Sequence, residues 1–219
     1  GVRPWLSSVS TQEYMKFQPG RCGYTHFLDH DGLIIDDMIF AVSSESEVLG
    51  VPNSTMVGIM FQWLSEQLPS DGSVTILDVS DNTSIIALQG PLSGQVIAEI
   101  IGTDNGVGAF RCQEIGNNEL GISGWIQGTG YTGEAGVEIF VSNEQAPILW
   151  DALNAHPSST PVGLGARDTL RMEKGYLLSG QDFLWPGISV SCEVLPDGFL
   201  SRTTSETSVP FGLDLSHDF

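Results

Sequence analysis

Apolar and polar residues alternate along many short stretches of the chain, a spacing typical of strands that bury one face. Residues 22–28 and 32–42 form the first such pair. The segment between them, Asp29-His30-Asp31-Gly32, contains an Asp-Gly pair, which is a strong hairpin signal. We therefore expect an antiparallel hairpin here, followed by a short strand near residues 47–51.

Helical spacing follows this third strand. Apolar residues at positions 56, 59, 60, 63 and 64 form one stripe, and Ser54 or Thr55 can cap a helix that ends near Gln67. The pattern then repeats, with strands expected at 74–79, 84–88, 111–115, 121–127 and 137–141, and helices at 90–101, 143–154 and 165–174. Strand pairs that alternate with single helices predict an α+β fold, in which antiparallel sheets with packed helices form two related halves.

Charge and composition narrow the possible partners. The 219 residues include 8 Lys and Arg against 27 Asp and Glu, a formal net charge of −19. Nucleic acids and anionic membranes bind clustered bases, so we expect neither as a partner. Apolar runs also stop well short of the roughly 20 residues that span a membrane. The three cysteines are far apart, which argues against a disulfide framework or a cysteine zinc site and favours a cytoplasmic protein.

Two apparent motifs are better explained by turns. Residues 128–133 match G-x-G-x-x-G, but the dinucleotide motif must open a helix, whereas residues 137–141 predict a strand. We expect a glycine-rich turn between two strands. His26, Asp29, His30 and Asp31 have metal-binding side chains, but a turn separates the two histidines, so we expect no metal site.

Carboxylates interrupt two of the expected strands. Alternation places Asp36 and Asp37 on opposite, otherwise apolar faces. Burying a carboxylate is costly without a hydrogen-bond partner, so either one of them has a partner or ligand, or one faces solvent. Glu138 lies in a similar strand. A carboxylate fixed there could accept two parallel N–H donors, such as the edge of a pterin, or it could simply be exposed.

Three of the eight bases lie close together near residue 170. Arg167, Arg171 and Lys174 share one face of the expected helix. Such a stripe either neutralises local acids, such as Asp168, or receives an anionic ligand.

Together these segments resemble the aminomethyltransferase family, which comprises the T-protein of the glycine cleavage system and its tetrahydrofolate-dependent relatives. The resemblance rests on GYT at 23–25, IIDD at 34–37, ALQGP at 87–91, GYTGEAGVEI at 130–139, and GLGARDTLRME at 163–173 with Tyr176 and GQD at 180–182. These motifs occur in the family's order.

The resemblance also implies how the chain is divided. Residues 1–72 would be the remainder of a first folate-binding subdomain, 73–160 a second α+β subdomain, and 161–182 a helical segment that completes the folate site. Residues 183–219 are rich in Pro, Ser, Thr and Gly and would lead toward a C-terminal β-barrel. The family's N-terminal segment and this barrel both lie outside the sequence, so the chain resembles a central fragment.

Carried over by position, the family motifs imply a catalytic carboxylate at Asp37. Glu138 would hold the pterin edge. The other residues that would line the folate site are Tyr24, Asn53, Tyr131, Arg167 and Tyr176.

The implied activity belongs to glycine catabolism. A methylene unit would pass from an aminomethylated lipoyl carrier protein, the glycine cleavage H-protein, to tetrahydrofolate, with release of ammonia. Two alternatives remain: a tetrahydrofolate-dependent demethylase of a small methylated compound, and a non-enzymatic folate-binding protein that assists iron–sulfur assembly. The last group carries K-G-C-Y-x-G-Q, whereas this chain has KGYLLSGQ at 174–181, which together with Asp37 favours an enzyme.

Overall fold

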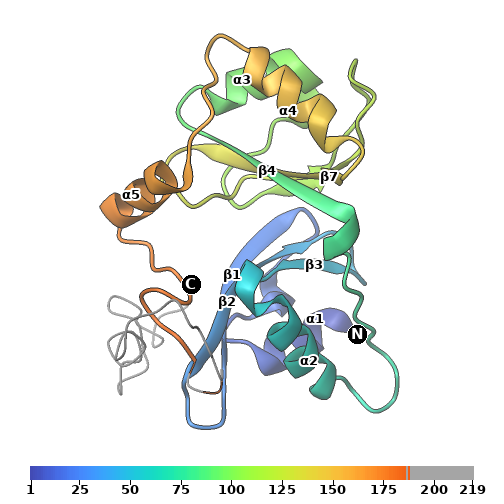
Figure 1. The fold of residues 1–219 in the computed structure, drawn as a ribbon. Helices are drawn as coiled ribbons and strands as arrows, with labels where there is room; N and C mark the ends of the chain where they lie inside the picture. Colours follow the sequence, from blue (N-terminus) through green and yellow to red (C-terminus); the bar gives the residue numbers. More distant parts are fainter. Residues whose placement is uncertain (186, 188–219) are drawn as a thin grey trace.

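The computed structural model describes residues 1–185 and 187, which form two halves that each combine a sheet with helices (Figure 1). The first sheet has the order β1-β2-β3 and is antiparallel, with β1 at Arg21–Leu28, β2 at Ile34–Val42 and β3 at Val48–Val51. The expected hairpin is confirmed: Asp29 accepts backbone N–H groups of Asp31 and Leu33 through its side chain, and Gly32 has a φ of 80°.

Helices cover one face of the first sheet. They are α1 (Val2–Val9), α2 (Val57–Glu66) and the short 3-10 helices η1 (Tyr14–Lys16) and η2 (Ser54–Met56). Their apolar side chains pack with those of β1 and β2 into one core, which includes Leu6, Phe27, Phe40 and Met60. All five apolar residues of the stripe expected at 56–64 lie in this core or pack against it.

The second half repeats this architecture around a four-stranded antiparallel sheet of order β4-β7-β6-β5. The strands are β4 (Thr83–Gln89), β5 (Cys112–Glu114), β6 (Gly124–Gln127) and β7 (Gly136–Ser142). Helices α3 (Ser93–Ile101) and α4 (Ala146–Ala155) pack on it, and 3-10 turns η3 (Ser80–Asn82) and η4 (Thr103–Asn105) precede β4 and follow α3. The α+β class with antiparallel sheets is therefore confirmed.

The two sheets lie between the two sets of helices, so that their inner faces meet (Figure 1). A third buried cluster fills this contact: Cys22 and Ala41 come from the first sheet, and Cys112 and Trp125 from the second. An isolated antiparallel bridge between Arg21 and Arg111 joins the edge of β1 to the second half beside β5. The inner surface between the sheets is thus continuous from one half to the other.

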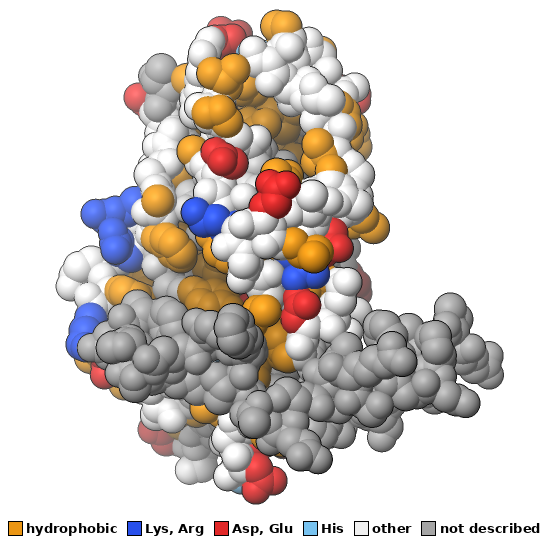
Figure 2. Space-filling view, turned by 90° about the vertical axis from the view of Figure 1, so that its left-hand side faces the viewer, with side chains coloured by type: hydrophobic (Ala, Val, Ile, Leu, Met, Phe, Trp, Pro, Cys, Tyr) orange, Lys and Arg blue, Asp and Glu red, His pale blue; other side chains and the backbone are white. Residues whose placement is uncertain are grey.

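The last helix, α5 (Leu164–Lys174), lies beside both sheets in Figure 1. It ends at Gly175, which has a left-handed φ of 83°, and Tyr176 N donates back to Arg171 O. Figure 2 shows the face of the molecule on this side, where apolar side chains are visible among acidic and basic ones. Val162, Leu164 and Met172 are among the exposed apolar residues of this segment.

Two features of the first half differ from the expectations. Helix α1 was not expected, because its eight residues give too short a pattern to reveal a helical period. The strand expected at 74–79 is wrong. Residues 73–79 form no strand; they connect the halves, with Val74 buried and Ile76 packed on the first core while Leu77 is exposed. Alternating burial thus arises here without strand pairing.

Candidate functional site

Asp37 lies on the inner face of the first sheet, with both carboxylate oxygens held. Tyr24 on β1 donates its hydroxyl to Asp37 Oδ2 at 2.7 Å, and Asn53 donates Nδ2 to Asp37 Oδ1 at 2.8 Å. Tyr24 pairs with Ile39 across the hairpin, so Asp37 lies diagonally opposite it on the same face. The Asp37 side chain is half-buried, which leaves it fixed in orientation and still accessible.

The Asp36 side chain is fully buried, whereas that of Asp37 is half-buried. It accepts Asn53 N at 3.2 Å and Asn53 Nδ2 at 2.8 Å. Burial raises the pKa of Asp36 to about 7, although the hydrogen bonds from Asn53 oppose this shift. Asn53 therefore connects two carboxylates that alternation places on opposite faces, an arrangement that the strand pattern alone did not indicate.

Tyr24 and His26 form the neighbouring part of the site on β1. Burial and the adjacent Asp37 raise the pKa of Tyr24, so its phenol remains a hydrogen-bond donor at neutral pH. The His26 ring meets the Tyr24 ring edge-on, with 4.9 Å between centroids. Burial lowers the pKa of His26, which favours the neutral imidazole. His26 pairs with Asp37 in the strand register, and sequence reasoning did not assign it to the site.

Glu138 lies on β7, opposite Gln127 of β6. Thr129 Oγ1 donates to Glu138 Oε2, and Gln127 Nε2 donates to Thr129 Oγ1 at 2.8 Å and to Glu138 Oε2 at 3.4 Å. Gln127 and Thr129 are both buried. One carboxylate oxygen is thus held by the protein. Sequence reasoning missed these two supporting residues, although Gln127 ends an apolar strand run and could have been noticed there.

Tyr131, Tyr176 and Arg167 form a stack at the edge of the site. The two tyrosine rings are stacked with 6.0 Å between centroids and 26° between planes, and the Arg167 guanidinium carbon lies 4.6 Å from the Tyr131 centroid. Tyr131 donates its hydroxyl to Leu177 O. Burial raises the pKa of Tyr131 to about 12.

Asp37 raises the pKa of Tyr131, and Tyr131 raises the pKa of Tyr24, which indicates that the stack lies within electrostatic range of the Asp37 cluster. The structure therefore gathers residues from β1, β2, the turn before β7, the first turn of α5 and the segment that follows α5. Glu138 also lies on a strand of the inner sheet contact, beside Phe140, which packs against the third cluster.

The basic stripe on α5 separates into different roles. Arg171 is buried; it pairs with Asp168 at 2.7 Å and with Asp182, and it donates to Tyr176 O at 3.0 Å. Arg167 and Lys174 are exposed. Neutralisation of local acids is therefore the role of Arg171, whereas Arg167 remains available beside the tyrosine stack.

The turn motifs behave as turns. Residues 128–135 connect β6 to β7, so the interpretation of G-x-G-x-x-G as a glycine-rich turn between strands is confirmed. Asp29 accepts backbone N–H groups of its own hairpin and the Trp185 indole N–H at 2.7 Å. Within residues 1–185 and 187, no three His, Cys, Asp or Glu side chains are grouped as a metal site would require.

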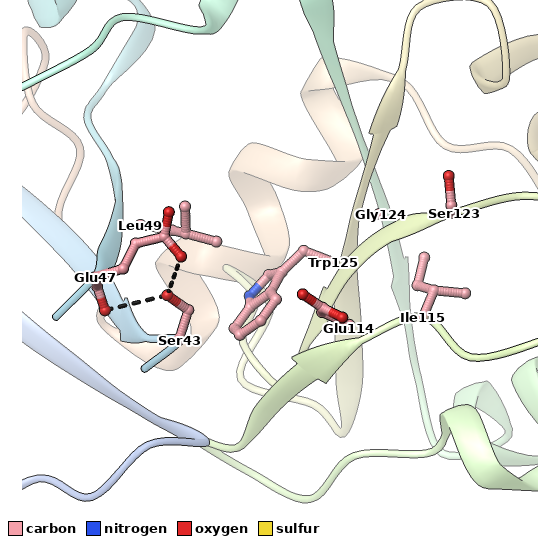
Figure 3. Close-up of a pocket in the computed structure, with 8 residues that line it drawn as sticks. All are labelled: Ser43, Glu47, Leu49, Glu114, Ile115, Ser123, Gly124 and Trp125. Carbon is pink, nitrogen blue, oxygen red and sulfur yellow. Dashed lines mark hydrogen bonds between the residues drawn. The ribbon is translucent and has the colours of Figure 1, made fainter. Parts of the chain in front are cut away.

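A pocket of about 400 Å³ lies between the sheets (Figure 3). Its walls include Ser43, Glu47 and Leu49 from the first half, and Glu114 and Trp125 from the second. Ser43 lies six residues beyond Asp37, or about 20 Å along an extended strand. The pocket is therefore separate from the Asp37 cluster.

The part of the chain that the structure describes contains no helix long and apolar enough to cross a membrane. A comparison with family models identifies the family of the chain. The model of the GCVT N-terminal domain matches residues 1–184, and the chain belongs to this family.

Its relatives are aminomethyltransferases by name. The chain is 34% identical over 215 residues to the aminomethyltransferase of Geobacillus thermodenitrificans, covering 96% of this chain and 57% of the relative. It is 38% identical over 185 residues to that of Chlorobaculum parvum, covering 81% and 50%. The chain thus spans about half the length of the curated relatives it matches.

A solved structure shares the fold. The glycine cleavage system aminomethyltransferase T from Bartonella henselae matches with a TM-score of 0.71 at 26% identity, over 82% of this chain and 48% of that one. The chain is therefore a member of the aminomethyltransferase family with that family's fold.

Proposed function

We propose that this protein transfers a one-carbon unit from an aminomethylated lipoyl carrier protein to tetrahydrofolate and releases ammonia. The observation that carries the proposal is the Asp37 carboxylate, which Tyr24 and Asn53 hold at 2.7 and 2.8 Å on the inner face of the first sheet. Family membership supports the same reaction class. Tetrahydrofolate, when bound, supplies the amine nitrogen that accepts the one-carbon unit.

Asp37 is the proposed catalytic residue. Since both oxygens are already held by neutral donors, the carboxylate does not have to reorient when positive charge develops nearby. The raised pKa of Tyr24 keeps its hydroxyl proton on the phenol, so this donor persists across neutral pH. Asp37 can then stabilise the developing charge and orient the attacking nitrogen.

The residues present fit a folate. Glu138 Oε2 is occupied by Thr129 and Gln127, and Oε1 has no hydrogen-bond partner within the described residues, which leaves it for N–H donors of a pterin edge. Tyr131 and Tyr176 offer ring faces, and the exposed Arg167 offers a cation for the anionic end of a folate. Asn53 would act through Asp37, because its side-chain amide is engaged with both carboxylates.

A donor comparison tests this proposal. The full-length protein is incubated with tetrahydrofolate and either an aminomethylated lipoyl carrier or free methylated amines and sulfonium compounds, and ammonia and folate products are quantified. We expect ammonia release only when the aminomethylated lipoyl carrier is the donor. One-carbon transfer from a free methylated donor would instead establish the demethylase, and folate binding without turnover of any donor would establish a binding protein.

We propose that the reaction takes place in the cytoplasm.

A further inference from the structure

Two cysteines lie together where the two halves meet. Cys22 N donates to Phe110 O at 2.9 Å, and Cys112 N donates to Gly20 O at 3.1 Å, so these bonds flank the bridge between Arg21 and Arg111. Because side chains alternate along a strand, both cysteines point away from the two arginines and into the cluster between the sheets. Their relative exposures are 2% and 5%, and both are free thiols.

The two thiols differ in their ease of ionisation. The neighbouring Cys22 thiol lowers the pKa of Cys112, and the nearby Arg111 and Arg21 lower it further. The neighbouring Cys112 raises the pKa of Cys22, together with burial and the negative charge of Glu138. Cys112 is thus the thiol that ionises first, and Cys22 keeps its proton.

We propose that Cys22 and Cys112 form an oxidation site that closes to a disulfide across the two halves when the protein meets a hydroperoxide. Both side chains are buried in one cluster and lie on the same face of two segments joined by backbone hydrogen bonds, where they are diagonal neighbours. A small shift of the junction brings their sulfurs within bonding distance. Hydrogen peroxide is the appropriate oxidant because it is small enough to reach a nearly buried thiol through limited opening of the junction.

The chemistry proceeds in two displacements. The Cys112 thiolate attacks one peroxide oxygen, the O–O bond breaks, and the other oxygen leaves as water after taking a proton; Cys112 becomes a sulfenic acid. The Cys22 sulfur, as it loses its proton, then attacks the Cys112 sulfur. The S–O bond breaks, a second water leaves and the S–S bond forms. The two thiols lose two electrons in total, and one peroxide is reduced to two waters.

Gln127 connects the two cysteines to the candidate folate site. Cys22 Sγ lies 4.0 Å from Gln127 Oε1, within hydrogen-bond range for sulfur, and Gln127 Nε2 donates toward Thr129 and Glu138. Disulfide formation removes the thiol proton from Gln127 and moves the sulfur toward Cys112. The oxidised protein should therefore hold Glu138 less well and bind folate more weakly, a consequence that rests on the proposed function.

The first experiment detects the bond itself, independently of folate. The full chain with Cys192→Ser, which removes the cysteine outside the described residues, is treated with hydrogen peroxide, quenched, digested without reductant and analysed by mass spectrometry. We expect a peptide pair joined through Cys22 and Cys112, and a rise in melting temperature of roughly 5 to 10 °C that dithiothreitol reverses. Absence of this linked pair after oxidation would overturn the proposal.

A second experiment tests which thiol reacts first. In Cys22→Ser with Cys192→Ser, no resolving thiol remains, so dimedone should trap a sulfenic acid at Cys112. In the matched Cys112→Ser with Cys192→Ser protein, labelling of Cys22 should be at least about tenfold slower. Equal or reversed labelling would contradict the assigned order. Should either variant fail to fold, the linked peptide in the Cys192→Ser protein decides the proposal.

A third experiment tests whether the disulfide between Cys22 and Cys112 weakens folate binding. Binding of 5-formyltetrahydrofolate, which resists oxidation, is compared by calorimetry for the reduced and the disulfide-bonded protein, with expected weakening of at least about threefold on oxidation. Equal affinity in the two states would refute the effect of oxidation on folate binding, while the proposed disulfide would be judged by the first experiment. If the reduced protein binds no folate, it is the proposed function that fails.

Discussion

At the scale of single residues, Asn53 connects the two carboxyl groups of the candidate site. Its side-chain amide donates to both Asp36 and Asp37, and its backbone N–H adds a second bond to Asp36. One neutral residue thus fixes a buried carboxyl and the proposed catalytic carboxylate at once. The two carboxyl groups differ in exposure, since Asp36 is buried and Asp37 is partly exposed.

Asp36→Asn should change how stability depends on pH. The folded-state pKa of Asp36 is raised to about 7, above that of an unfolded Asp, so the folded form binds an extra proton between about pH 4 and 7. Stability from this group is therefore full at low pH and lost as pH rises through that window. We expect the variant to gain stability relative to wild type from pH 4 to pH 8 in urea unfolding. A difference independent of pH would contradict the shift.

Glu138→Gln should weaken folate binding by about tenfold, because the neutral amide loses the charge assistance, and its NH2 group cannot accept from Thr129 and Gln127 while its oxygen faces the pterin. Calorimetry with a reduced folate measures this effect. Glu134→Gln is the matched control, since Glu134 is exposed in the turn just before the same strand and should bind folate like wild type. Equal affinities for the two variants would remove the pterin role of Glu138.

Strand alternation predicted some residues of the site and missed others for a clear reason. It placed Asp37 and Glu138 on faces where a carboxylate needs partners, and Tyr24, Thr129, Gln127 and Asn53 supply them. Tyr24 and Asn53 came from the resemblance, whereas Gln127 and Thr129 were not identified. Their contacts depend on which strands are neighbours, and alternation along one strand does not specify this.

At the scale of elements, α5 shows how a helical stripe divides once it packs. Arg167, Arg171 and Lys174 share a face by spacing, but the chain after Gly175 folds back so that Asp182 reaches Arg171. The helix spacing was predictable; the return of the following segment was not, because it depends on the left-handed turn at Gly175. The same limit explains residues 74–79, where alternating burial occurs in a connection without strand partners.

Arg171→Gln should destabilise the protein by about 2 kcal/mol, because it removes the charged donor shared by Asp168, Asp182 and the Tyr176 carbonyl. Urea unfolding measures the change. Lys174→Gln on the same helix is the control and should stay within about 0.5 kcal/mol of wild type, since Lys174 is exposed. An equally small effect at Arg171 would show that its ion pairs contribute little.

At the scale of the whole molecule, the charge of −19 defines the electrostatic conditions for docking of a carrier. Of the bases in the described residues, Arg3 pairs with Glu45 and Arg171 with two acids, which leaves few to offset the acidic surface. A lipoyl carrier should therefore dock through a neutral or basic face.

Salt dependence tests this docking model. Affinity for an acidic carrier should rise several-fold between 20 and 300 mM salt, because screening reduces repulsion between surfaces of like charge. Surface plasmon resonance with the full-length protein gives the trend. Tight binding of a strongly acidic carrier at low salt, weakening as salt is added, would contradict the model.

We propose that Asp37 acts in the transfer step, while other groups bind the folate. The most direct measurement is single-turnover transfer from an aminomethylated lipoyl carrier by Asp37→Asn, with folate affinity measured on the same preparation by calorimetry. Asp31→Asn, an exposed position in the adjoining hairpin turn, is the matched control and should behave like wild type. We predict a rate at least about 100-fold lower for Asp37→Asn, with folate affinity within about threefold of wild type. A wild-type transfer rate in that variant would show that the Asp37 carboxylate is not required for transfer.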